Sequence, residues 1–239
     1  NKWWAKLLRI VGIVLMSLTA AFTLMGGAGT SCVALNPTGF GGKFAGIASF
    51  QWLWILFVLI GVAAGILGVR AVVLLIKGSN KAYRAAIIAL LIGTIINAIH
   101  IVASRSLRGA SMPVDGVFYT NILTFLVFLL FRIPGIWKSV NFEKPVENEQ
   151  TGRKAAAFSL IIVGVLTLTI QFMMAPTHII SGFNYADVWH VALSILGGGL
   201  LLSGVFTILS PYFSMMNFKA LWVVKILRAR NKKLKHSSF

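Results

Sequence analysis

The chain alternates between long apolar segments and short polar ones. Six segments of about 20 residues are almost free of charged side chains, and a helix of that length can cross the hydrocarbon core of a bilayer. The six are Leu7–Leu24, Trp52–Ile76, Ala85–Ala103, Val117–Trp137, Ala155–Ala175 and Val188–Leu209. A segment in lipid must satisfy its own backbone hydrogen bonds, and none of these alternates with the period of a barrel strand. All six are therefore predicted to be helices.

Composition agrees with a membrane location. Of the 239 residues, 58% are hydrophobic and only 11% are charged, whereas about 25% of a soluble domain is charged. We predict an all-α integral membrane protein, a bundle of six transmembrane helices over residues 1–210, followed by a basic amphipathic cytoplasmic tail over 211–239. The first segment is basic at its start and has small residues before Cys32, as a secretory signal does, but we expect a retained span.

The basic residues predict an orientation. If the N-terminus is cytoplasmic, all 22 Lys and Arg residues except Lys43, Arg105 and Arg108 fall on the cytoplasmic side. This positive-inside bias predicts that both termini are cytoplasmic, in a bacterial-type plasma membrane. We expect the net charge of +17 to face anionic lipid headgroups and not nucleic acid. The tail contributes a run of cations: Lys225, Arg228, Arg230, Lys232, Lys233 and Lys235.

Glycine and tryptophan have separate expected roles. Small residues let membrane helices approach closely, so we predict helix packing, or alternatively a subunit contact, at Gly61, Gly65, Gly197, Gly198 and Gly204. The glycine-rich stretch over 26–50 is predicted to be a loop that either lies at the membrane interface or dips inward. An aromatic belt at the span ends is predicted from Trp3, Trp4, Trp52, Trp54, Trp137, Trp189 and Trp222.

Polar residues follow one helix face at the outer end of the third span. Spacings of four, three, four and four residues place on that face Gly93, Asn97, His100, Ser104 and Arg108. In the last span, His190 follows Asp187 on a shared face. Because His100 and His190 fall at similar depth, we predict that both face the bundle interior and converge. Asp115 would join them, with Arg105 and Arg108 at the rim.

This cluster has three interpretations. It is either a set of interfacial side chains with structural hydrogen bonds, a site for a polar ligand or ion, or a site for a metal, haem or pigment. The ligand-binding set would be His100, His190, Asp187, Asp115, Arg105, Arg108, Asn97 and Ser104. A metal would use His100, His190 and Asp187, and a haem would use the two histidines. The sequence itself requires no cofactor.

Three functions remain open. The favoured one is a non-catalytic subunit or scaffold of a membrane complex, because the sequence has no nucleotide motif, soluble domain or mid-membrane carboxylate. The second is a small transporter or channel with an outer-facing His/Asp/Arg vestibule, and the third is a metal- or haem-binding redox protein or enzyme. No residue is proposed as catalytic. Interhelical hydrogen bonds are predicted for Asn121 with Thr124 and for Gln171 with Thr167.

Overall fold

The computed structural model describes residues 2–40, 42–144, 149–174, 178–180 and 182–211. Six helices in this part of the chain are long and apolar enough to cross a membrane, as predicted. They are Trp3–Leu35, Ala45–Lys77, Ala82–Arg108, Val114–Phe131, Gln150–Phe172 and His190–Pro211. The cations predicted to anchor the tail, Lys225 to Lys235, lie outside the described residues.

The elements follow one another with short connections. Helix α1 (Trp3–Leu35) is followed by two 3-10 turns, η1 (Pro37–Gly39) and η2 (Ala45–Phe50). The next four helices are α2 (Gln51–Lys77), α3 (Ala82–Arg108), α4 (Val114–Phe131) and the short α5 (Pro134–Val140). Helix α6 (Glu149–Met174) follows. A small antiparallel hairpin and one helical turn then precede the His190–Pro211 helix; these are β1 (Ile179–Ile180), β2 (Phe183–Asn184) and α7 (Tyr185–Val188).

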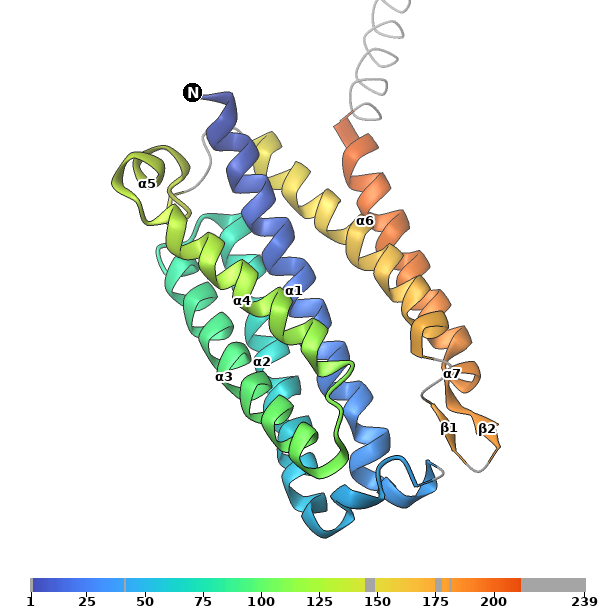
Figure 1. The fold of residues 1–239 in the computed structure, drawn as a ribbon. Coiled ribbons are helices and arrows are strands. Elements are labelled where there is room, and N and C mark those ends of the chain that lie inside the picture. Colours follow the sequence, from blue (N-terminus) through green and yellow to red (C-terminus); the bar gives the residue numbers. More distant parts are fainter. Residues whose placement is uncertain (1, 41, 145–148, 175–177, 181, 212–239) are drawn as a thin grey trace, which may run out of the picture.

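The long helices form two groups (Figure 1). Helices α1 to α4 pack together, and α6 with the His190–Pro211 helix forms a hairpin whose α6 packs against α1. A hydrogen bond of 2.9 Å from Ser17 to Ser159 links α1 to α6. The start of α1, the α2–α3 turn and α5 lie at one end of the molecule, here called the basic end. The α3–α4 turn and the β hairpin lie at the opposite end.

Glycines end two of the helices. Gly78 follows α2 with φ 65°, and Gly109 follows α3 with φ 71°. This left-handed conformation suits a residue without Cβ and brings backbone donors to the last carbonyls of a helix. The Gly78 N–H donates to Leu75 O at 3.3 Å, and the Gly109 N–H donates to Arg105 O at 2.9 Å. Both turns therefore begin where the sequence supplies a glycine.

Helix α1 is longer than its apolar segment. It continues to Leu35, so the predicted irregular loop is wrong for residues 26–35. The reason is close packing: a Cβ added to Gly27 would lie 2.7 Å from Val62 N and 2.8 Å from Gly61 C. A Cβ on Gly65 would lie 2.7 Å from Leu24 Cα. The packing predicted for Gly61 and Gly65 is confirmed, and these glycines serve a helix contact instead of a turn.

Glycines also form the contact between α6 and the His190–Pro211 helix. A Cβ on Gly197 would lie 2.8 Å from a Leu168 side-chain atom, and one on Gly204 would lie 2.8 Å from Ala157 O. The predicted packing role of these two glycines is confirmed. No described heavy atom would lie within 4 Å of a Cβ on Gly198, so helix packing is not seen there and the alternative of a subunit contact stays a prediction.

Apolar side chains fill the four-helix group near the basic end. Phe128 stacks on Phe142 with ring centroids 5.5 Å apart, and Phe131 packs edge-on against Phe128 at 5.6 Å. Ile13 and Met16 of α1 and Leu90 of α3 join the same buried cluster. This half of the group is closed by tight packing of large side chains.

Candidate functional site

The polar face of α3 points into the four-helix group. Gly93, Asn97, His100 and Ser104 are all buried, which confirms the helical phase predicted from their spacing. His100 is only 7% exposed, as expected for a side chain that faces the interior. The interior of the group near its opposite end therefore includes a row of polar side chains from α3.

Aromatic side chains of α2 hold His100. Its imidazole stacks on Phe57 with ring centroids 4.2 Å apart, and Trp54 meets it edge-on at 5.7 Å. Trp54 is 2% exposed, so its predicted place in an aromatic belt is wrong. The reason is that Trp54 faces α3 and is covered by the imidazole and by Ile47 of η2.

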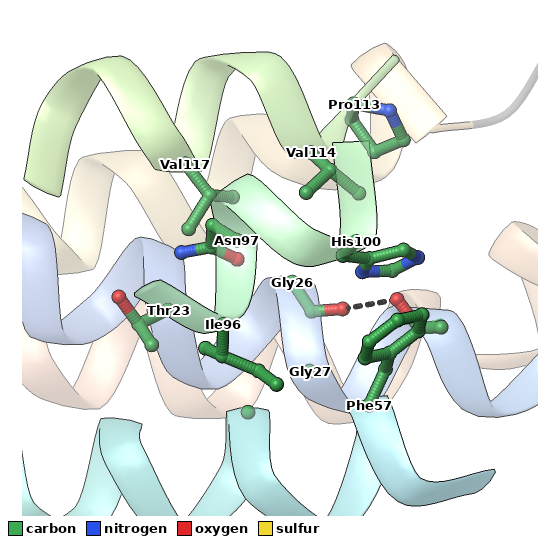
Figure 2. Close-up of a pocket in the computed structure, with 12 residues that line it drawn as sticks. Thr23, Gly26, Gly27, Phe57, Ile96, Asn97, His100, Pro113, Val114 and Val117 are labelled. Carbon is green, nitrogen blue, oxygen red and sulfur yellow. Dashed lines mark hydrogen bonds between the residues drawn. The ribbon is translucent and has the colours of Figure 1, made fainter. Parts of the chain in front are cut away.

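A small cavity lies beside His100 (Figure 2). Its volume is about 30 Å³, and all four helices of the group contribute to its wall. Figure 2 shows Asn97 and His100 on α3 and the backbone of Gly26 and Gly27 on α1, with Phe57 against the imidazole. The remaining lining residues are Thr23, Thr30, Gly61, Ile96, Pro113, Val114 and Val117. No side chain in this wall is charged.

Asn97 brings an unpaired polar group to that cavity. The side chain is 9% exposed, and Nδ2 has no hydrogen-bond partner among the described residues. The hydroxyls of Thr94 and Ser104, on the same helix, are buried and unpaired in the same way. Arg108 Nε is a fourth. Buried polar groups are normally paired, so four such groups along one helix mark an unusual environment.

The neighbouring contact between α1 and α4 is fully paired by comparison. Asn121 Nδ2 donates to Thr23 Oγ1 at 2.9 Å and to Val117 O at 3.0 Å. The hydroxyls of Thr19 and Thr124 lie 2.7 Å apart. The interhelical hydrogen bonds predicted for Asn121 and Thr124 are confirmed. This ladder of polar contacts runs from the cavity toward the apolar cluster and ends there.

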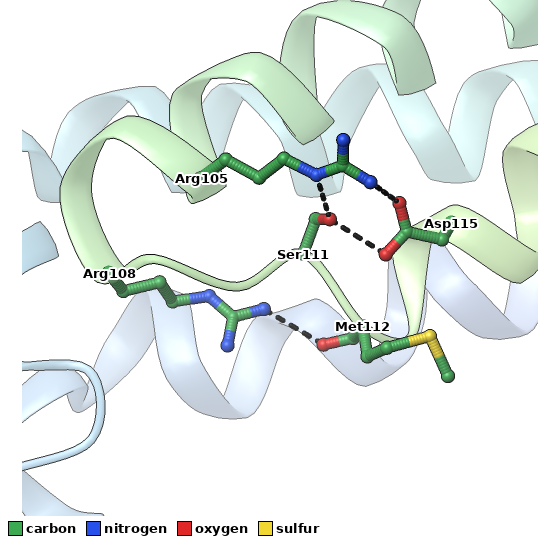
Figure 3. A network of polar contacts seen from close by, with 5 residues as sticks. All are labelled: Arg105, Arg108, Ser111, Met112 and Asp115. Atoms are coloured by element: carbon green, nitrogen blue, oxygen red, sulfur yellow. Dashed lines mark hydrogen bonds and ion pairs between the residues drawn. The ribbon is translucent and has the colours of Figure 1, made fainter.

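A polar network closes the α3–α4 turn (Figure 3). Arg105 forms an ion pair of 2.9 Å with Asp115, and Ser111 Oγ donates to the second carboxylate oxygen at 2.7 Å. Arg108 donates to Met112 O at 2.8 Å, and its guanidinium lies 4.9 Å from the centroid of the Phe44 ring. The structure thus brings Arg105 and Asp115 together, as predicted. They pair with each other and not with a histidine.

His190 and Asp187 lie elsewhere. His190 Nδ1 is 2.7 Å from Gln171 Oε1 of α6, which confirms an interhelical hydrogen bond for Gln171. Both His190 and Asp187 are exposed, so the prediction that His190 faces the bundle interior is wrong. The cause is that the His190–Pro211 helix packs on α6 and contributes nothing to the cavity wall. Among the described residues, no three His, Cys, Asp or Glu side chains converge where they could hold a metal.

Arg9 is a buried charged residue that the sequence-based predictions missed. Although only 5% exposed, its guanidinium donates to four backbone carbonyls, those of Leu75, Val140, Asn141 and Lys144, at 2.7–3.4 Å. Its position in α1, six residues after the helix begins, is the available signal: an arginine so far inside an apolar helix needs partners.

Comparison with protein-family models, curated proteins and solved structures found no match for the chain.

Proposed function

We propose that the protein is a non-catalytic subunit or scaffold of a membrane complex, with its basic end toward the cytoplasm and anionic lipid headgroups. In this proposal α1 to α4 form the stable body of the protein. The hairpin of α6 and the His190–Pro211 helix is the arm that binds a helix of another membrane subunit. The unequal burial of the helices is the observation that carries the proposal.

The His190–Pro211 helix is the least buried of the six. Only 11% of its most apolar 18-residue stretch is buried by the described chain, against 44% for the corresponding stretch of α1 and 39% for that of α3. Its large apolar side chains point outward, including Val191, Ile195 and Leu202. Helices in a membrane associate through packing and close approach, so a helix with one neighbour retains most of its surface for a partner.

Small residues on the open side of that helix suit a close helix contact. Gly197 and Gly204 pack against α6. Gly199 and Ser203 instead lie on an exposed face, and they have the four-residue spacing of small residues that is typical of helix pairs. Gly199 has no described heavy atom within 4 Å of an added Cβ. A partner helix with small residues of its own would fit this face.

The two other functions have less support. A transporter needs a route through the bundle, but the polar ladder ends at the cluster of Phe128, Phe131 and Phe142. A haem or pigment needs far more room than a cavity of about 30 Å³. The two histidines that would hold a haem have different partners, Phe57 for His100 and Gln171 for His190.

Site-directed cross-linking in native membranes tests the proposal. The chain has a single cysteine, so Cys32→Ala gives a background in which one cysteine can be placed at will. We expect Ser203→Cys, treated with a short membrane-permeant bifunctional reagent, to give one cross-linked product of discrete mass. Ile99→Cys, on a 51%-exposed site of α3, is the matched control and should give none.

The mass of the product identifies the partner class. A mass increase other than that of one further copy indicates a different subunit, and an increase of one copy indicates a homo-oligomeric scaffold. If Ser203→Cys gives no product, and light scattering in mild detergent gives the mass of a single chain, the subunit proposal is wrong.

A further inference from the structure

We infer that the cavity beside His100 is a binding site for a small neutral molecule that both donates and accepts hydrogen bonds, of the size of one or two waters. The site is separate from the helix face proposed to bind a partner, so either proposal can fail alone. Asn97, His100 and Thr30 supply its polar contacts, and Phe57, Val114 and Val117 supply its apolar wall.

The unpaired amide of Asn97 is the first reason. An amide presents a carbonyl acceptor and two N–H donors, and Nδ2 of Asn97 has no partner among the described protein atoms. A buried amide without a partner is unfavourable. Asn97 lines the cavity, so a molecule placed there lies beside this amide.

The second reason is the complementary chemistry of the neighbouring groups. A neutral imidazole has one donor and one acceptor nitrogen, and the neighbours of the His100 ring in α2 are the aromatic rings of Phe57 and Trp54. Thr30 uses its proton on Gly26 O at 2.8 Å, which leaves its hydroxyl oxygen as an acceptor. A ligand between these groups has to donate and accept, as water does.

The absence of charge from the wall decides that the ligand is neutral. Of the twelve lining residues, only His100 has a side chain that can become charged, and it does so by taking up a proton. The nearby carboxylate of Asp115 is paired with Arg105 and Ser111. Moving an ion into such a wall costs much more than moving a neutral polar molecule, because no Lys, Arg, Asp or Glu lines the cavity.

The volume decides the size. A single water needs a cavity of roughly 10–15 Å³ by this kind of measure, so a cavity of about 30 Å³ accepts one or two. Gly26 and Gly27 contribute backbone only, and a Cβ on Gly26 would lie 3.0 Å from Val117 Cγ2. The glycines therefore keep the space open.

Magnetisation transfer from water to histidine rings tests the inference in the full-length protein in bilayers. The chain has four histidines, which can be labelled selectively and assigned by single replacement. We expect the ring of His100 to receive magnetisation directly from water, although it is buried. Asn97→Leu removes the amide at similar size and should slow the transfer to His100 at least two-fold.

Gln171→Leu is the matched control, because it removes a buried amide that is distant from the cavity wall. It should change the signal of His190, its hydrogen-bond partner, and leave transfer to His100 unchanged. If water does not reach the His100 ring in the unmodified protein, the inference is wrong. It is equally wrong if Asn97→Leu leaves the transfer rate unchanged, because Asn97 would then be no part of the site.

Discussion

The two ends of the four-helix group bury polar side chains in opposite ways. At the basic end, Arg9 is 5% exposed, and four carbonyls from three parts of the chain accept its hydrogen bonds. Toward the opposite end, Asn97 is comparably buried, yet the described chain offers its Nδ2 no acceptor at all. At Arg9 the protein supplies four acceptors and leaves only Nε unpaired, whereas at Asn97 it supplies no acceptor for Nδ2.

This difference separates a structural polar residue from a candidate for binding. The guanidinium of Arg9 holds α1 to the end of α2 and to the segment after α5, so its hydrogen bonds fix the backbone. An incompletely paired group contributes nothing to such fixing and costs free energy unless a further molecule completes it. Loss of Arg9 should therefore affect stability strongly, and changes around Asn97 should affect what enters the cavity.

The largest expected effect is that of Arg9→Ala. Removing the guanidinium leaves four carbonyls without their charged donor, and hydrogen bonds to charged groups are among the stronger ones. We expect the free energy of unfolding to fall by about 3 kcal/mol, measured by denaturant titration in mixed micelles. Arg9→Lys keeps the charge but not the fork of donors, so it should recover only part of the loss. A decrease below 1 kcal/mol for Arg9→Ala would remove the contrast between the ends.

A smaller effect is expected at the contact of α1 with α2. Gly27→Ala places a Cβ against backbone atoms of Gly61 and Val62, which cannot move aside as a flexible side chain can. The helices must separate, and such overpacking costs about 1–3 kcal/mol. The matched control is Gly198→Ala, whose Cβ meets no described atom within 4 Å and should be neutral. Thermal unfolding monitored by circular dichroism compares the two; equal melting temperatures would contradict the close packing.

The smallest effect is expected at the α3–α4 turn. Asp115→Asn removes the charge of an ion pair whose Arg105 side chain is 59% exposed. Because solvent screens such pairs, the free energy of unfolding should fall by less than about 1 kcal/mol, and the difference should shrink at high salt. Melting curves at low and high ionic strength measure it. A large, salt-independent loss would mean that this turn is as important to the fold as Arg9.

The six long apolar helices were predictable because they depend on composition and segment length, which are local properties. The phase of α3 was predictable for the same reason: the spacing of Asn97, His100 and Ser104 places them on one face whatever the neighbours are. The partners of that face were not predictable. Matched depth suggested that His100 and His190 would meet, but depth contains no information about which helices are adjacent.

The errors at glycine and tryptophan have a common cause. Gly26 and Gly27 suggested a loop, yet they lie within α1, because their lack of side chains is used where α1 meets α2 and α4. Trp54 suggested the membrane surface, yet it packs against His100. In each case a residue type has two uses, one local and one tertiary, and a single sequence does not distinguish them. The carbonyl partners of Arg9, which come from distant backbone, were beyond any such pattern.

The separation of Arg9 from its acceptors in the sequence has a consequence for biosynthesis. Leu75 comes 66 residues after Arg9, and Lys144 comes 135 residues after it. At a translation rate of 5–20 residues per second, the last acceptor is made about 7 to 27 seconds later. During that interval the guanidinium lacks carbonyl partners that it has in the folded chain, so its full set of hydrogen bonds can form only after Lys144 has been made.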